Sequence, residues 1–211
     1  MINVIKYEDE DTLPISVIVP LSKKRRYFFD NFVFPMLEAN MTAEIIINDD
    51  EGSAPKKRND GFQKSTQPYV FFCDDDIVIP KTYLEKLYNA IKNNDFGFAY
   101  SGYYGIVQFP ENHPIGRNFS IPTKTFNAEE LKWGNYISTM SLIKRDVFPM
   151  FDEKLKRLQD YSLWLTIVER GGKGIAVFNN EFYAYYLDSG ITSNTNSEID
   201  AINAIRVKHN I

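Results

Sequence analysis

The sequence predicts one α/β domain over residues 1–211, built on a mixed sheet that is mostly parallel in its N-terminal half and has helices on both faces. Two observations predict this class. Short strands that are apolar throughout alternate with segments of helical periodicity, and such strands are typical of a parallel sheet buried on both sides. In addition, 211 residues with 44% hydrophobic side chains are enough for a sizeable core.

Three strands are predicted in the first half, over residues 15–20, 44–47 and 69–72, because each is a β-branched or aromatic run. Helices are expected over 27–39, with a kink at Pro35, and over 54–65. Pro80 suits the first position of the next helix. That helix has apolar residues at i, i+3, i+4 and i+7 spacing, at Leu84, Leu87, Tyr88 and Ile91.

The second half has weaker periodicity. Residues 96–109 are aromatic and interrupted by glycine, which is typical of irregular or antiparallel strands, and 110–124 are predicted to be a loop. A helix is expected over 159–170, ended by Gly171 and Gly172. Two more strands, over 174–178 and 183–187, precede a final helix.

Composition excludes several classes of protein. A net charge of −4 argues against a surface that coats nucleic acid. No apolar run approaches the ~20 residues of a membrane span, and the acidic N-terminus lacks the apolar region of a signal peptide. The single cysteine, Cys73, indicates a reducing compartment and is expected to be buried. We therefore expect a cytoplasmic protein.

Acidic or turn residues follow each of the first three strands. Pro20 ends the first, Asp49 and Asp50 follow the second, and a run of three aspartates, 74–76, follows the third. Since ligands bind beyond the carboxyl ends of parallel strands, chemistry is expected at this edge. Three adjacent carboxylates repel one another unless a cation compensates them, so the run favours Mg²⁺ or Mn²⁺ over a plain polar turn.

Each of the other candidate residues has two possible roles. Asp160, at the start of a helix, is either an N-cap or a general base. Asp49 and Asp50 either close a turn or bind a ligand. The basic runs 23–26 and 56–58 are either solvated helix starts or a phosphate neighbourhood.

Five motifs in this order resemble the family 2 nucleotide-sugar glycosyltransferases of GT-A (Rossmann-like) fold, over roughly residues 15–190. The motifs are ISVIVP, EIIINDDEGS, KRNDG, YVFFCDDDIVIP, and FDE followed by QDYSLW. The chain is also similar to the N-terminal glycosyltransferase domain of a large chlorella-virus protein. That similarity implies further domains of a longer chain and the cytoplasm of a host cell.

The resemblance implies a hexosyltransferase that moves a hexose or deoxyhexose from a UDP-sugar to a glycan hydroxyl, with inversion and with Mn²⁺ or Mg²⁺. About residues 1–110 would bind nucleotide and metal, and about 111–211 the acceptor. Asp160 would be the general base. The implied nucleotide contacts are Pro20, Leu21, Asp50, Arg58, Asn59, Asp74 and Asp75. Asp75 or Asp76 would bind the metal. The family's late histidine is missing, and Asp188 occupies a similar place: either it is a third ligand, or that contact is absent.

Two alternatives stay open. A phosphatase of the haloacid-dehalogenase type would use Asp74 as nucleophile and Asp76 as acid/base, although its motif normally follows the first strand. A module that binds nucleotide sugars without turnover is the other. Donor choice is expected to depend on the pocket built by residues 100–135.

Overall fold

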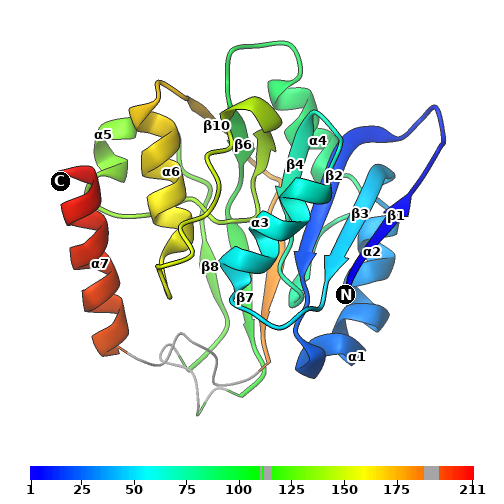
Figure 1. Cartoon of the computed structure of the whole chain (residues 1–211), viewed down its shortest axis with the longest axis horizontal. Coiled ribbons are helices and arrows are strands. Elements are labelled where there is room, and N and C mark those ends of the chain that lie inside the picture. Colours follow the sequence, from blue (N-terminus) through cyan, green and yellow to red (C-terminus); the bar gives the residue numbers. More distant parts are fainter. Residues whose placement is uncertain (110, 112–115, 188–194) are drawn as a thin grey trace.

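The computed structural model describes residues 1–109, 111, 116–187 and 195–211, and Figure 1 shows how their helices and strands are arranged. These residues form a seven-stranded and a four-stranded sheet. The order in the larger sheet is β1 (Ile2–Lys6), β3 (Thr42–Asn48), β2 (Leu13–Pro20), β4 (Tyr69–Phe72), β9 (Leu142–Lys144), β6 (Phe98–Tyr100) and β10 (Gly174–Ala176). The order in the smaller sheet is β5 (Ile77–Val78), β11 (Phe182–Tyr186), β7 (Tyr103–Val107) and β8 (Phe119–Ile121).

Five strands of the larger sheet run in one direction, and β1 and β9 run against them. Alternate residues of the central strands enter two cores, one on each face. In β2, Val17 and Val19 pack into one core and Ile18 into the other; in β4, Phe71 and Phe72 divide in the same way. Because both faces are buried, these strands have no polar side, which is the pattern that predicted the sheet.

Helices cover both faces, as Figure 1 shows. One face carries α2 (Phe34–Glu38) and α4 (Tyr83–Ile91). The other carries α3 (Ala54–Lys64) and α6 (Gln159–Glu169), with α7 (Thr195–His209) packed against α6. Two shorter helices, α1 (Arg26–Phe28) and α5 (Ala128–Leu131), complete the described set. The predicted mixed α/β class is confirmed.

The predicted helix boundaries need two corrections. Pro80 does not begin a helix: its carbonyl accepts the Tyr83 N–H in a turn, and α4 begins at Tyr83. Residues 27–38 are helical, as predicted, but the run is divided into α1, a π-helical turn over Phe29–Val33, and α2. The regular helix is interrupted just before Pro35, because proline has no N–H and its ring crowds the preceding turn.

Several short elements were not predicted, namely β1, β5, β8, β9 and α5. Residues 110–124 were predicted as a loop, yet they contain β8. The three residues of β9 lie antiparallel between β4 and β6 and join the two parts of the larger sheet. Of the helices in the described residues, none is both long and apolar enough to cross a membrane.

Polar contacts hold α7, the last helix, against α6 and the segment that precedes it. The His209 ring bonds through Nδ1 to Glu169 Oε1 at 2.7 Å and through Nε2 to Ser162 Oγ at 3.0 Å. At the other end of α7, Glu198 pairs with Arg157 at 2.9 Å. Since Arg157 belongs to the segment that leads into α6, α7 supports the segment that walls the site described next.

Candidate active site

The carboxyl ends of β2, β3 and β4 lie at one edge of the larger sheet, as their parallel order predicts. A cavity of about 530 Å³ opens there; it is called the acidic–basic cavity below. Its walls come from the end of β2, the start of α3, the residues after β4 and the segment that begins α6. Predicted site residues from distant parts of the chain meet in it, namely Pro20, Arg58, Asp74, Asp75 and Asp160.

Asp75 is the most buried of the three consecutive carboxylates, at 3% exposure. The Ser22 N–H donates to its Oδ2 at 2.6 Å, and Arg25 Nη1 donates to its Oδ1 at 2.9 Å. Burial raises the pKa of Asp75, and these two donors oppose that rise. Arg25 Nη1 also lies 2.9 Å from Asp76 Oδ2, so one guanidinium compensates two carboxylates.

The other two carboxylates have different surroundings. Asp74 pairs through Oδ1 with Nη2 of Arg58. The buried Arg58 side chain also donates a hydrogen bond to Gln159 Oε1 at 3.1 Å and lies over the Phe151 ring. Asp76 is partly buried, and burial raises its pKa to about 7; Arg25 opposes this rise, and Asp74 and Asp75 add to it. Three neighbours in the sequence therefore carry out three different structural roles.

The predicted metal ligands are Asp75, Asp76 and Asp188, of which Asp188 lies outside the described residues. Over residues 1–109, 111, 116–187 and 195–211, no three His, Cys, Asp or Glu side chains are arranged to hold a metal. The donors present still fit a hard divalent cation. They are oxygen ligands, and Asp76 is a partly buried carboxylate whose ionised form a cation would stabilise. Mg²⁺ and Mn²⁺ commonly use one or two carboxylates together with substrate phosphates.

Asp160 is not the N-cap of α6. Leu158 holds that position with a left-handed φ of 54°, and Asp160 is the second helical residue. The half-buried Asp160 carboxylate accepts Asn135 Nδ2–H at 2.9 Å on Oδ2 and the Tyr161 N–H at 2.9 Å on Oδ1. Burial raises the pKa of Asp160, and the Tyr161 N–H, Arg58 and Asn135 oppose that rise. The carboxylate also lines a second, smaller cavity of about 240 Å³.

Cationic side chains outnumber carboxylates around the acidic–basic cavity. Three carboxylates line it, from Asp74, Asp75 and Asp160. Five cations line it, from Arg25, Lys57, Arg58, Lys156 and Arg157. Arg25, Arg58 and Arg157 are paired with carboxylates, so Lys57 and Lys156 supply the positive charge that no ion pair among the described residues offsets. That charge would attract a polyanion such as a diphosphate. The start of α3 adds backbone N–H groups and the positive end of a helix dipole.

The remaining predicted nucleotide contacts lie around the cavity rather than in it. Leu21 is fully buried, and its carbonyl accepts Lys57 Nζ at 2.8 Å. Asp50 is exposed and bonds to the Met1 amino group. The Asn59 amide is bound to the segment before α6, through Phe151 N–H at 2.8 Å and Phe151 C=O at 3.0 Å. Asn59 thus joins α3 to the segment that positions Asp160.

Sequence reasoning did not single out Arg25, Lys57, Asn135, Lys156 or Arg157 as site residues. Arg25 and Lys57 fall within the basic runs 23–26 and 56–58, for which a phosphate neighbourhood was one of two readings. Asn135, Lys156 and Arg157 have no local signal, because only the tertiary structure brings their segments to the edge of the sheet.

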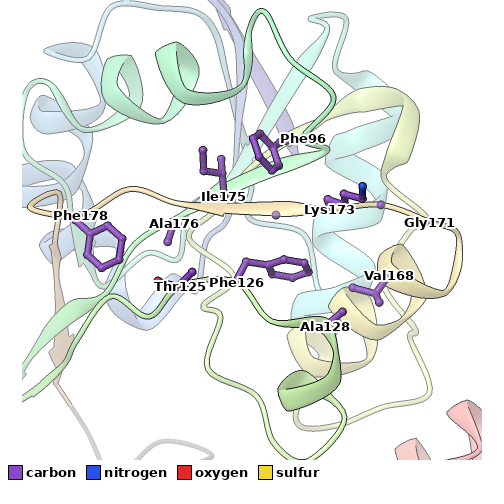
Figure 2. Close-up of a pocket in the computed structure, with 12 residues that line it drawn as sticks. Phe96, Thr125, Phe126, Ala128, Val168, Gly171, Lys173, Ile175, Ala176 and Phe178 are labelled. Atoms are coloured by element: carbon purple, nitrogen blue, oxygen red, sulfur yellow. The ribbon is translucent and has the colours of Figure 1, made fainter.

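A further cavity, of about 520 Å³, lies around β10 and the end of α6 and is shown in Figure 2. It shares no residue with the acidic–basic cavity. Its lining is mainly apolar, with Phe96, Phe126, Val168 and Ile175, and Lys173 is the one charged residue among the described residues that line it. The described residues that line this cavity include no Asp, Glu or His and only one cation, so we do not consider it a candidate site for group transfer.

Comparison with known proteins agrees with this geometry. The model of Glycosyl transferase family 2 matches residues 41–150, just over half of the chain. No curated protein matches the sequence. Among solved structures, S. aureus TarS 1-349 matches with a TM-score of 0.66 and 13% identity, over 93% of this chain and 65% of that one. The same protein in complex with UDP-GlcNAc matches with a TM-score of 0.68 and 15% identity, over 93% and 66%.

At this identity the likeness to TarS is one of fold, and the chain spans about two thirds of the TarS fragment. The mixed sheet with helices on both faces is the GT-A fold. The family match includes β3, α3, β4 and the three aspartates 74–76 (the acid cluster), and it covers just under half of the residues that line the acidic–basic cavity. The end of β2 and the segment that begins α6, with Asp160, lie outside the match. This chain belongs to glycosyl transferase family 2.

Proposed function

We propose that this chain transfers a hexose or deoxyhexose from a UDP-sugar to a hydroxyl group of a glycan, with inversion at the anomeric carbon. One observation carries the proposal: Asp74, Asp75 and Asp160 line the same cavity as five cationic side chains. A departing diphosphate needs positive charge, and an attacking hydroxyl needs a base. The acidic–basic cavity supplies both.

The chain's own residues account for the main steps. Positive charge from Arg25, Lys57 and Arg58 is in place before the reaction and stabilises the charge that develops on the diphosphate. Asp160 accepts the proton of the acceptor hydroxyl as its oxygen attacks the anomeric carbon from the face opposite the diphosphate. Burial raises the pKa of Asp160 towards neutral pH, which suits a general base. A single displacement of this kind inverts the configuration.

Mn²⁺ or Mg²⁺ is the proposed cofactor, held by Asp75 and Asp76 with Asp188 as a further ligand. When bound, the cation would act as a Lewis acid on the diphosphate. Asp74 is proposed to contact the ribose and Asp50 the base. The other proposed nucleotide contacts are Pro20, Leu21, Arg58 and Asn59.

The TarS fragment has been solved with UDP and with UDP-GlcNAc, which supports UDP as the nucleotide here. The glycan acceptor, further domains of a longer chain and a location in the cytoplasm, of a host cell if the protein is viral, stay predictions. The division into a nucleotide half and an acceptor half near residue 110 is a prediction as well.

The test measures binding and turnover of a panel of nucleotide sugars with Mn²⁺ or Mg²⁺, in wild type and three variants. Asp75→Asn should lose metal-dependent UDP-sugar binding. Asp160→Asn should bind donor normally but transfer at least ~100-fold more slowly, because general base catalysis contributes 10²–10⁴ in rate. Asp95→Ala, exposed and outside the cavity, is the control and should match wild type.

Two results would overturn the proposal. Absence of UDP-sugar binding together with turnover of a phosphate ester would restore the phosphatase alternative. UDP-sugar binding with no transfer or hydrolysis in wild type, over a broad set of glycan acceptors, would favour a binding module. Unchanged transfer by Asp160→Asn would remove that residue as the base while leaving the family unaffected.

A further inference from the structure

The smaller cavity beside Asp160 differs in charge from the acidic–basic cavity. Its volume is about 240 Å³, and Asp74, Thr139 and Asp160 line both cavities, so the two adjoin at these residues. Three carboxylates face it, from Asp74, Asp76 and Asp160, and no Lys, Arg or His is among its described lining residues. Arg25 and Arg58, the ion-pair partners of Asp76 and Asp74, line the acidic–basic cavity and not the smaller one.

One wall of the smaller cavity is aromatic and bears hydroxyl groups. Tyr103 of β7 stacks on Phe182 of β11, with ring centroids 5.2 Å apart. The Tyr103 hydroxyl hydrogen-bonds the hydroxyl of Tyr186, which also lines the cavity. Ser138 and Thr139 add two more hydroxyl groups. Flat apolar rings with neutral donors and acceptors suit a ligand that is apolar on its ring faces and hydroxylated at its rim.

The position of this cavity indicates which part of the donor it would hold. The diphosphate is drawn to the cations of the acidic–basic cavity. The anomeric carbon joins the diphosphate to the sugar and must lie within reach of a hydroxyl that Asp160 deprotonates. It therefore lies at the junction of the cavities, and the sugar ring extends into the smaller one.

We propose that the smaller cavity selects donors whose sugar is uncharged and rejects uronic acids, with Tyr103 and Tyr186 as sugar-contacting residues. This proposal rests on the proposed function, since it assigns the sugar end of the same donor. A uronate places a carboxylate beside Asp74, Asp76 and Asp160, on the side of these groups away from Arg25 and Arg58, which line the acidic–basic cavity. Neighbouring carboxylates repel one another in a partly buried site, so the charge of the donor sugar affects binding here more strongly than its shape does.

The first experiment compares dissociation constants of UDP, UDP-glucose, UDP-galactose and UDP-glucuronate, at one concentration of Mn²⁺ and at pH 7.5. UDP-glucose and UDP-galactose should bind at least as tightly as UDP, and UDP-glucuronate at least about tenfold more weakly than UDP-glucose. UDP-glucose and UDP-glucuronate carry the same nucleotide and are measured with the same cation, so the difference between their dissociation constants is due to the sugar. Equal affinity for UDP-glucuronate and UDP-glucose would overturn the proposal while leaving the proposed function standing. Failure of UDP itself to bind would contradict both this proposal and the proposed function.

The second experiment tests the aromatic wall. Tyr103→Phe removes one hydroxyl, and the affinity for UDP-glucose should fall at least about threefold while that for UDP stays the same. Tyr104→Phe is the matched control: it is the next residue of β7, is 42% exposed and stacks on Tyr183. If Tyr103→Phe and Tyr186→Phe both leave UDP-glucose affinity unchanged, the sugar does not contact this wall and the assignment is wrong. A fall in UDP affinity equal to that for UDP-glucose would contradict it too.

Discussion

Arg25 is expected to be the main internal counter-charge of the acid cluster, and removing it should destabilise the protein. Its Nη1 lies 2.9 Å from Asp75 Oδ1 and 2.9 Å from Asp76 Oδ2, and Asp75 is almost fully buried. Breaking a buried ion pair costs about 3–5 kcal/mol. Arg25 is 25% exposed, so water can partly replace it. We therefore expect Arg25→Ala to lower the free energy of unfolding by about 2–3 kcal/mol, or roughly 4 to 12 °C in Tm for a domain of this size.

The effect should depend on pH and on divalent cations. Burial already raises the pKa of Asp75 and Asp76 above that of a free aspartate, and loss of Arg25 raises it further. The cost of holding these groups ionised is fully present above their folded pKa and absent below about pH 3.9, where they are protonated in both states. Stability of Arg25→Ala relative to wild type should thus be lowest at pH 8. Mn²⁺ should restore more stability to this variant than to wild type, because it binds the folded state at the vacated charge.

The assay is urea unfolding followed by circular dichroism at pH 5 and pH 8, with and without Mn²⁺. Arg26→Ala is the matched control, since Arg26 makes an exposed i,i+4 pair with Asp30 and should change stability by less than about 1 kcal/mol. Equal stability of Arg25→Ala and Arg26→Ala at pH 8 would refute the reasoning. An equal Mn²⁺ effect in wild type and Arg25→Ala would show that the cation does not use these carboxylates.

Two further predictions concern the base and the packing of α3. Asn135→Ala removes a donor to Asp160, and a hydrogen bond to a charged group contributes about 1.5–3 kcal/mol. The pKa of Asp160 should rise, so the acidic limb of the kcat/KM profile moves up by about one to two pH units; a limb that stays in place contradicts this. Gly61→Ala should destabilise by about 1–3 kcal/mol in urea unfolding, because a Cβ there would lie 2.5 Å from Ile18 Cγ2. Gly134→Ala, whose Cβ would meet nothing within 4 Å, is the control, and a stabilised Gly61→Ala would refute the packing argument.

The parts of the fold that were predictable have local signals. The central strands β2, β3 and β4 are continuous apolar runs because both faces of each are buried. The helix α6 has apolar periodicity and ends at Glu169, two residues before Gly171, whose φ is +84°. Parallel order then brings the ends of these strands to one edge, so the place of the acid cluster followed from topology.

The unpredicted parts depend on contacts between distant segments. β9 has only three residues and is a strand because β4 and β6 lie on either side of it. Arg25 reaches Asp75 across 50 residues, and Asn135 reaches Asp160 across 25. A single polar residue in a loop has no periodicity from which to predict such a partner. The basic run that contains Arg25 therefore left two readings open.

The run FFCDDD separates the features that local sequence predicts from those that depend on tertiary contacts. Its sequence alone determined a buried strand followed by three carboxylates at the edge of a sheet, because apolar side chains are driven from water and charged ones are retained there. It did not distinguish Asp74, Asp75 and Asp76, which have the same chemistry. Only the tertiary structure separated them, since the pKa and partner of a carboxylate depend on burial and on nearby charges. Those came from Arg25 and Arg58, residues far from the run in sequence.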